Sequence, residues 1–281
     1  MALGDLLYRG SALWKRLAGN TTATRKFLSQ TGTGVISAVP SWNNVYSEFV
    51  STSTGNIDDL DFNNADVIFM NNATDAIIRG LKAGTDGQRV TIHSKGAGHV
   101  FFAHQNTNSA VANRLINSTT IGTTPIAAGA GSATYVYDET TVRWRLDNHF
   151  QGAWITPTFD AADYFATGAT TVWTVAAGDI TNFQYYLTGN KLEINFNITG
   201  STITSTSATE LNRNIPNSFQ ASKGTQLVTI VVDNSTTKVG KSRIAASAVL
   251  INWYNDVVTP TAWANAADTT GMLGYILMSL I

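Results

Sequence analysis

The sequence predicts an all-β protein, and three features of its 281 residues support this. Hydrophobic residues make up 43 % of the chain, which is enough to build buried cores. Charged residues make up only 13 %, roughly half the usual fraction, and Ser, Thr and Asn take their place. Threonine favours strands, whereas Asn and Gly favour tight turns. Short apolar runs separated by such turns therefore indicate β-structure throughout.

Residues 1–46 hold only short apolar pieces, and we do not expect this segment to bury a core alone. Clusters of Gly, Ser and Thr separate the apolar pieces, as in ATRKFLSQTGTGVISAVPSWNN at 23–44. We expect this segment to fold only against copies of itself or a larger partner. Its start does not resemble a signal peptide, because Asp5 and Arg9 interrupt the apolar run.

Residues 47–150 are expected to form a small β-domain of short strands. The clearest pattern is RVTIHSKGAGHVFFAH at 89–104, which predicts a hairpin with Gly96-Ala97-Gly98 as its loop. Its core face would carry Val90, Ile92, Val100 and Phe102. The sequence shows no solenoid-period repeat, which argues against a long parallel β-helix. The other expected strands are DVIFMN, AIIRGL, TYVYDE and VRWRLD.

Residues 151–281 are expected to form an antiparallel β-sandwich or jelly-roll. The run FQYYLTGNKLEINFNIT predicts a hairpin with Gly189-Asn190 at its turn. The final GMLGYILMSLI is too short to span a membrane, and we expect a buried last strand instead. One face of the second strand of this hairpin would be buried, and it would carry Leu192, Ile194, Phe196 and Ile198.

Charge and cysteine content exclude several classes of function. The net charge of −1 and the pI of about 6.4 give no basic excess, so a nucleic-acid partner is not expected. The absence of cysteine excludes disulfides, thiolate zinc sites and cysteine nucleophiles. A β-protein without disulfides needs another source of stability outside a cell, such as oligomerisation.

No set of residues forms a convincing catalytic or metal site. His93 and His99 would be diagonal neighbours across the predicted hairpin, without a nearby carboxylate, so surface or subunit packing is the favoured interpretation. His104 is expected at the core edge and His149 in the linker. Asp58, Asp59 and Asp61 lack the pattern of a calcium loop, and nothing sets the separation that a glycosidase pair would need for Asp160 and Asp163. We therefore expect no enzyme activity, cofactor or metal.

Three aromatic residues are the better candidates for ligand contact. Trp253 and Tyr254 lie in LINWYNDVV, and Trp263 lies in TPTAWANAAD, all beside polar residues. An aromatic face flanked by Asn and Asp suits a sugar ring, which needs apolar stacking and hydrogen bonds. The alternative is that these rings pack in the sandwich or across a subunit interface.

The order of motifs resembles tail-fibre and virion-appendage proteins of tailed bacteriophages. GDLLYRG and TRKFLSQTGTGVISAVPSW resemble a fibre segment of that family. LKAGTDGQRVTI, AHQNTNSAVANRLI and YVYDETTVRWRL resemble a second fibre module, and QGAWITPTF with WTVAAGDITNFQYYLTGNKLEINFNI resembles C-terminal modules.

The resemblance implies a non-enzymatic virion structural protein, usually a homotrimer with a β-rich head. Residues 1–46 would attach it to other virion proteins, and the head would contact a host-surface receptor such as a glycan. A capsid decoration or head-fibre protein, held to the shell by the same segment, is the alternative. In a trimer, a shared apolar stripe in the N-terminal segment would consist of Phe27, Leu28, Val35, Ile36 and Trp42.

Overall fold

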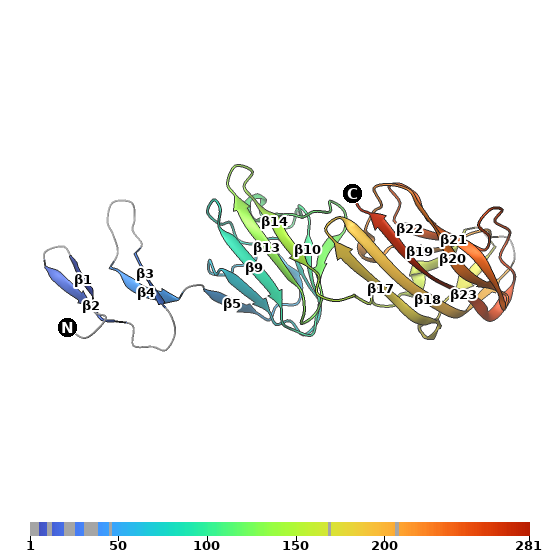
Figure 1. The fold of residues 1–281 in the computed structure, drawn as a ribbon, viewed down its shortest axis with the longest axis horizontal. Helices are drawn as coiled ribbons and strands as arrows, with labels where there is room; N and C mark the ends of the chain where they lie inside the picture. Colours follow the sequence, from blue (N-terminus) through green and yellow to red (C-terminus); the bar gives the residue numbers. More distant parts are fainter. Residues whose placement is uncertain are drawn as a thin grey trace.

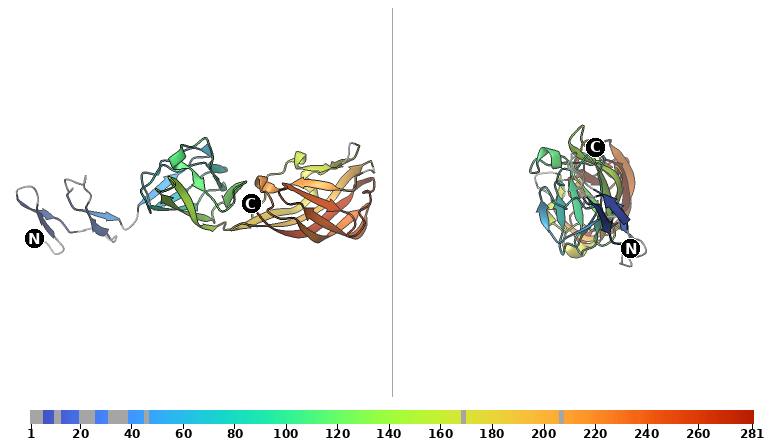
Figure 2. Two further views of the ribbon diagram at one scale, coloured as in Figure 1. Left: turned by 90° about the horizontal axis from the view of Figure 1, so that it is seen from above. Right: turned by 90° about the vertical axis from the view of Figure 1, so that its left-hand side faces the viewer.

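The computed structural model describes residues 6–9, 13–19, 26–30, 39–44, 47–167, 170–205 and 208–281. It confirms the all-β prediction, since these residues form strands and only 3-10 turns as helical elements. Two N-terminal hairpins, a middle domain and a C-terminal domain follow one another along a line (Figures 1 and 2). The two large buried cores fall on either side of residue 150, apart from Ala127, which packs in the C-terminal core.

Each N-terminal hairpin forms its own two-stranded antiparallel sheet. The first pairs β1 (Leu6–Arg9) with β2 (Trp14–Leu17), and the second pairs β3 (Lys26–Ser29) with β4 (Ser41–Asn44). The indole Nε1 of Trp42 donates a hydrogen bond of 2.7 Å to the Ala18 carbonyl and so joins the second hairpin to the end of the first. A two-stranded ribbon alone is marginally stable in water.

The middle domain begins as a short stack of parallel rungs, in which successive strands alternate between two sheets. One sheet pairs β5, β7 and β9 in parallel, and the other pairs β6, β8 and β10 in parallel. The strands are β5 (Glu48–Ser51), β6 (Gly55–Ile57), β7 (Val67–Met70), β8 (Ala76–Ile78), β9 (Arg89–Ser94) and β10 (Val100–Ala103).

The predicted hairpin over residues 89–104 is therefore wrong, and this short parallel stack was not foreseen from the sequence. β9 and β10 lie in different sheets, and the loop between them crosses from one sheet to the other. Gly96 and Gly98 lie against the backbone of Asn72 and Thr74 in the rung before, where a Cβ would overlap backbone atoms. The predicted core residues of the two strands are nonetheless confirmed, because their side chains pack in one hydrophobic core. Val90, Ile92, Val100 and Phe102 are fully buried.

Antiparallel strands complete both sheets of the middle domain. β12 pairs with β10, whereas β13 pairs with β9 and β14. His149 lies in β14, not in a linker, and its Nε2 lies 2.7 Å from the Pro125 carbonyl. The remaining elements are the turn η1 (Val111–Asn113), β11 (Leu115–Ile116), β12 (Thr123–Ile126), β13 (Ser132–Asp138) and β14 (Arg143–Phe150).

The C-terminal domain is a nine-stranded antiparallel sheet that wraps round its core until it is nearly closed. Its strand order is β15-β19-β22-β21-β20-β23-β18-β16, with β17 also paired to β18. The predicted β-sandwich character is confirmed. The strands are β15 (Tyr164–Ala166), β16 (Val172–Thr174), β17 (Ile180–Thr188), β18 (Lys191–Thr204), β19 (Leu211–Asn214), β20 (Thr225–Asp233), β21 (Thr236–Ile244), β22 (Leu250–Tyr254) and β23 (Ala266–Ser279), with 3-10 turns η2 (Ala161–Asp163), η3 (Ala177–Asp179) and η4 (Pro216–Ser218).

The strongest sequence pattern in this domain forms the predicted hairpin. β17 and β18 pair from Thr188↔Lys191, so Gly189-Asn190 is the connecting turn, and Gly189 adopts φ +59°. The last strand β23 departs from expectation, because only one of its faces is buried. The predicted inward residues of β18 are all fully buried, namely Leu192, Ile194, Phe196 and Ile198.

Hydrogen bonds connect the middle and C-terminal domains where they meet. Asn217 in η4 accepts a 2.6 Å bond from the Thr123 hydroxyl and donates a 2.7 Å bond to the Thr123 carbonyl. The Thr120 amide donates to the carbonyl of Ile281 at 2.8 Å, so the end of the chain also contacts the middle domain. These bonds hold the walls of the cleft described below.

Candidate functional site

The three aromatic residues proposed for ligand contact are buried, so that prediction is wrong. Trp253 and Trp263 are fully buried and Tyr254 is 7 % exposed. Trp253 belongs to β22, and its ring makes edge contacts with Trp173 and Phe196 in the core. The alternative of packing inside the sandwich therefore holds. The prediction failed because the polar residues beside these three aromatic residues mark the ends of strands and do not indicate that the aromatic rings are exposed.

The polar residues beside those rings form a structural network. The buried Asp233 accepts hydrogen bonds from Lys238 Nζ at 2.8 Å, Asn255 Nδ2 at 3.0 Å and the Ala264 amide at 2.9 Å. Burial alone would raise the pKa of Asp233, but these bonds outweigh it and hold the pKa below its usual value. The network fixes the 255–264 loop against the sheet, and it offers no open site.

The predicted N-terminal stripe is partly within the described residues. Leu28 and Trp42 lie directly opposite each other across β3 and β4, and Leu28 is 46 % exposed. Phe27 lies in β3 opposite Asn43, whereas Val35 and Ile36 lie outside the described residues. Further exposed apolar side chains of this segment are Leu6, Leu7, Leu13 and Val39.

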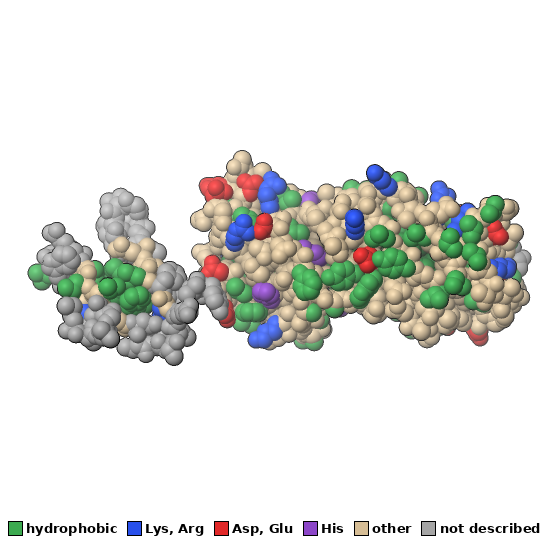
Figure 3. Space-filling view, viewed as in Figure 1, with side chains coloured by type: hydrophobic (Ala, Val, Ile, Leu, Met, Phe, Trp, Pro, Cys, Tyr) green, Lys and Arg blue, Asp and Glu red, His purple; other side chains and the backbone are tan. Residues whose placement is uncertain are grey.

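A broad apolar surface covers one side of the C-terminal sheet, and we call it the outer sheet face. Ile230 lies between Val239 and Leu273 in the strand register, so these three form a row across β21, β20 and β23. Such residues normally turn toward a core, yet each is at least 44 % exposed. The outer sheet face consists of Val228, Ile230, Val239, Leu273, Tyr275 and Leu277. Figure 3 shows hydrophobic side chains on this part of the C-terminal domain.

Charged residues lie on the two sides of the outer sheet face. Lys241 and Arg243 continue the outward side of β21, while Glu193 and Lys191 lie on the outward side of β18 beyond Leu277. Burial and then the hydrogen bond with Glu193 raise the pKa of Tyr275 to about 12, so its phenol stays protonated. The surface is thus an apolar band with two basic residues on one side and the oppositely charged Lys191 and Glu193 on the other.

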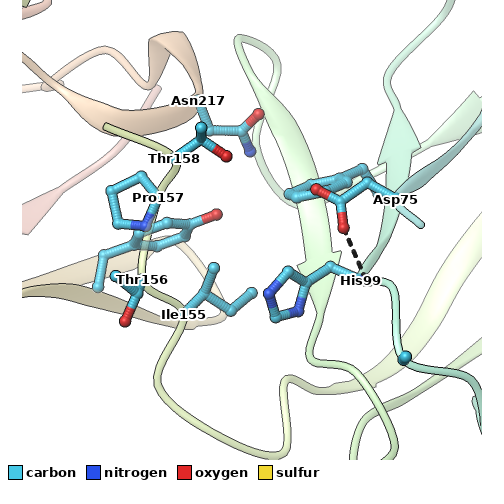
Figure 4. Close-up of a pocket in the computed structure, with 10 residues that line it drawn as sticks. Asp75, His99, Ile155, Thr156, Pro157, Thr158 and Asn217 are labelled. Atoms are coloured by element: carbon cyan, nitrogen blue, oxygen red, sulfur yellow. Dashed lines mark hydrogen bonds between the residues drawn. The ribbon is translucent and has the colours of Figure 1, made fainter. Parts of the chain in front are cut away.

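A cleft of about 330 Å³ opens between the middle and C-terminal domains (Figure 4). Its middle-domain wall carries Asp75, His99 and Phe101, and the His99 amide donates a 2.9 Å bond to Asp75 Oδ1. Its other wall is the segment after the domain boundary, together with a β17 tyrosine and an η4 asparagine. These lining residues are Ile155, Thr156, Pro157, Thr158, Tyr185 and Asn217. None of these residues was singled out for a ligand by sequence pattern except His99, because the chain brings them together from five separate segments.

The structure separates the histidines that the hairpin prediction had placed together. His93 stacks on Phe69, with ring centroids 5.6 Å apart, while His99 lines the cleft from the other sheet. His104 lies at the core edge as expected, where its Nδ1 accepts a bond from the Asn117 amide, and burial lowers its pKa.

The five aspartates that the sequence analysis weighed as metal ligands or as a glycosidase pair have structural roles. Asp58 pairs with Arg79 and Asp61 with Lys82, while Asp59 accepts from the Ala110 amide. Within the described ranges, no group of three or more His, Cys, Asp and Glu could hold a metal ion. Asp160 caps η2 by accepting from Ala162, and Asp163 accepts from the Asn214 amide.

Comparison with models of known protein families gives no match for this chain, and comparison with curated protein sequences gives none either. Among the residues that the structure describes, no helix is long and apolar enough to cross a membrane.

Proposed function

We propose that this chain is a non-enzymatic structural protein of a phage virion, a trimeric tail fibre or receptor-binding protein that contacts the host-cell surface. The motif resemblance in the sequence suggests this role. The line of N-terminal hairpins and two β-domains is compatible with it (Figure 1). Residues 1–46 would bind other virion proteins, and the particle would carry the protein outside the host cell.

The observation that carries the proposal is the outer sheet face. Six large apolar side chains on one sheet surface favour a protein partner, because solvent contact at such a patch is unfavourable. In a cyclic trimer, one edge of each subunit meets the opposite edge of the next. Arg243 on one side of the band would then approach Glu193 of a neighbouring copy. A closed trimer of this kind would cover the outer sheet face of each subunit and would leave no subunit interface unpaired.

Light scattering of the purified protein tests the self-association. The wild-type protein is expected at three times its 30.1 kDa monomer mass. The double variant Ile230→Thr with Leu273→Asn is expected to lower that mass, because it places polar groups in the centre of the band. Val258→Thr, at an 85 % exposed loop position away from the band, is the matched control and should leave the mass unchanged.

A monomeric wild-type protein would contradict the trimer, and an unchanged mass in the double variant would place the subunit interface elsewhere. Reversing the charges offers a second test. Glu193→Arg alone should weaken assembly, and combining it with Arg243→Glu should restore part of it, since the two charges of this pair are then exchanged.

A capsid decoration or head-fibre protein is the second candidate function. The exposed apolar residues of the N-terminal hairpins, such as Leu7 and Leu13, favour it, because they would pack against a shell protein. Labelled antibodies and cryo-electron microscopy of the intact particle separate the two: density at the tail supports the fibre, and density over the shell supports the decoration protein. Absence of the protein from purified particles would overturn both.

A further inference from the structure

The interdomain cleft is lined by a tyrosine whose hydroxyl makes no hydrogen bond to the described residues. Tyr185 lines the cleft, and its side chain is only 2 % exposed. Its hydroxyl forms no hydrogen bond within the described part of the chain, so it is available to a ligand. The negative charge of Asp75 adds to burial in raising the pKa of Tyr185, which places the phenol end near the opposite wall. A ligand in the cleft would find a protonated donor there.

His99 presents a second donor with a defined orientation. Its Nδ1 accepts a 3.0 Å hydrogen bond from the Ala128 amide, so in the neutral ring the proton is on Nε2. The ring points across the cleft toward Ile155, as Figure 4 shows. The bond from Ala128 fixes the ring before a ligand arrives.

The cleft combines these donors with an acceptor and apolar surfaces. Asp75 uses one carboxylate oxygen for the His99 amide, and its side chain lines the entrance. Phe101 and Pro157 contribute apolar surface, and Thr158 adds a hydroxyl. The lining contains no Lys or Arg, so an anion would meet only the repulsion of Asp75. A neutral ligand with several hydroxyl groups fits this combination of groups, and the volume lies at the small end of ligand sites.

We propose that the interdomain cleft binds a neutral carbohydrate, one or two sugar units in size, with Tyr185, His99 and Asp75 as its polar contacts. The biological meaning of this site, contact with host glycan, rests on the proposed function, but the binding itself does not. The hydroxyl of Tyr185 would donate to a sugar oxygen, and Asp75 would accept from a sugar hydroxyl. The ligand would touch both domains, since the two walls belong to different cores.

Saturation-transfer NMR of the full chain with a panel of neutral methyl hexopyranosides and their disaccharides tests the proposal. Wild-type protein should give saturable binding of at least one panel member. Tyr185→Phe, which removes only the hydroxyl, should weaken that binding by about tenfold. Tyr186→Phe is the matched control: it makes the same change on the opposite face of β17, and it should retain wild-type affinity.

The outcomes distinguish this inference from the proposed function. No binding by any neutral sugar, equal losses in both tyrosine variants, or preference for sialic acid over neutral sugars would overturn the cleft assignment. Calcium binding that is lost in Asp75→Asn, without sugar binding, would also overturn it. None of these results bears on whether the protein is a trimer on the virion, which mass and particle labelling decide separately.

Discussion

Asp233 is a buried carboxylate that remains ionised because three donors surround it. Its folded pKa lies below the ordinary value near 4, so the ionised group stabilises the fold above about pH 4. This contribution is lost as the pH falls through the folded pKa. We expect Asp233→Asn to lower the free energy of unfolding of the C-terminal domain by about 2 kcal/mol at pH 7, because the bond to Lys238 weakens.

Urea unfolding followed by tryptophan fluorescence at pH 7, 5, 4 and 3 measures this effect, since Trp253 and Trp263 lie in the same core. The difference between wild type and Asp233→Asn should narrow below pH 4. Asp268→Asn is the control, because this exposed aspartate in β23 accepts a bond from the Thr202 hydroxyl, which an asparagine oxygen can also accept. A difference that stays constant from pH 7 to 3 would show that the charge of Asp233 is not what stabilises the fold.

The burial of a single residue could be predicted from the sequence only where that residue lay in a clear alternation of apolar and polar residues. Leu192 and Phe196 alternate with polar residues, and that alternation alone places them in the core. Trp253 sits in a run where polar and apolar neighbours alternate less clearly, and its burial depends on strands far away in the chain. The cleft residues carry no local signal of any kind, because Asp75, Tyr185 and Asn217 meet only after both domains have formed.

At the scale of elements, the loop between β9 and β10 shows why strand existence is easier to predict than strand pairing. Two strands joined by Gly-Ala-Gly fit a hairpin within one sheet and a turn that crosses between two sheets equally well. Both connections need a tight turn. What decides between them is the pairing of Val67 with Thr91 and of Ala76 with Val100, each 24 residues apart. No repeated motif marks that spacing, so the parallel stack was invisible to sequence reasoning.

The close packing of the 95–99 loop on the loop before it leads to a specific prediction for Gly98. A Cβ at this position would overlap the carbonyl of Thr74, and backbone cannot move aside as a flexible side chain can. We expect Gly98→Ala to destabilise the middle domain by about 2 kcal/mol. Ala97→Ser, at the exposed position beside it, should change stability by less than about 0.5 kcal/mol. Thermal unfolding of both variants measures the effect, and equal melting temperatures would contradict the close stacking of the rungs.

On the scale of the whole molecule, the three parts of the chain differ in how they bury apolar surface. The middle and C-terminal domains each have a large core and are joined by bonds such as those between Thr123 and Asn217. The described N-terminal strands have only two-stranded sheets, with apolar residues such as Leu7 and Leu13 exposed. The short apolar pieces and the intervening Gly, Ser and Thr clusters of residues 1–46 predicted that this segment would bury no core of its own.

Deleting residues 1–46 should therefore separate assembly from folding. The shortened chain keeps every strand of the two cores, so its circular dichroism and melting temperature should stay within about 2 °C of the full chain. Its incorporation into particles, measured by immunoblotting of purified virions, should fall to background if this segment binds other virion proteins. A shortened chain that aggregates or melts much earlier would mean that the hairpins stabilise the domains directly. Normal incorporation would instead mean that the virion contact is made by the domains, and the outer sheet face would then be the first surface to mutate.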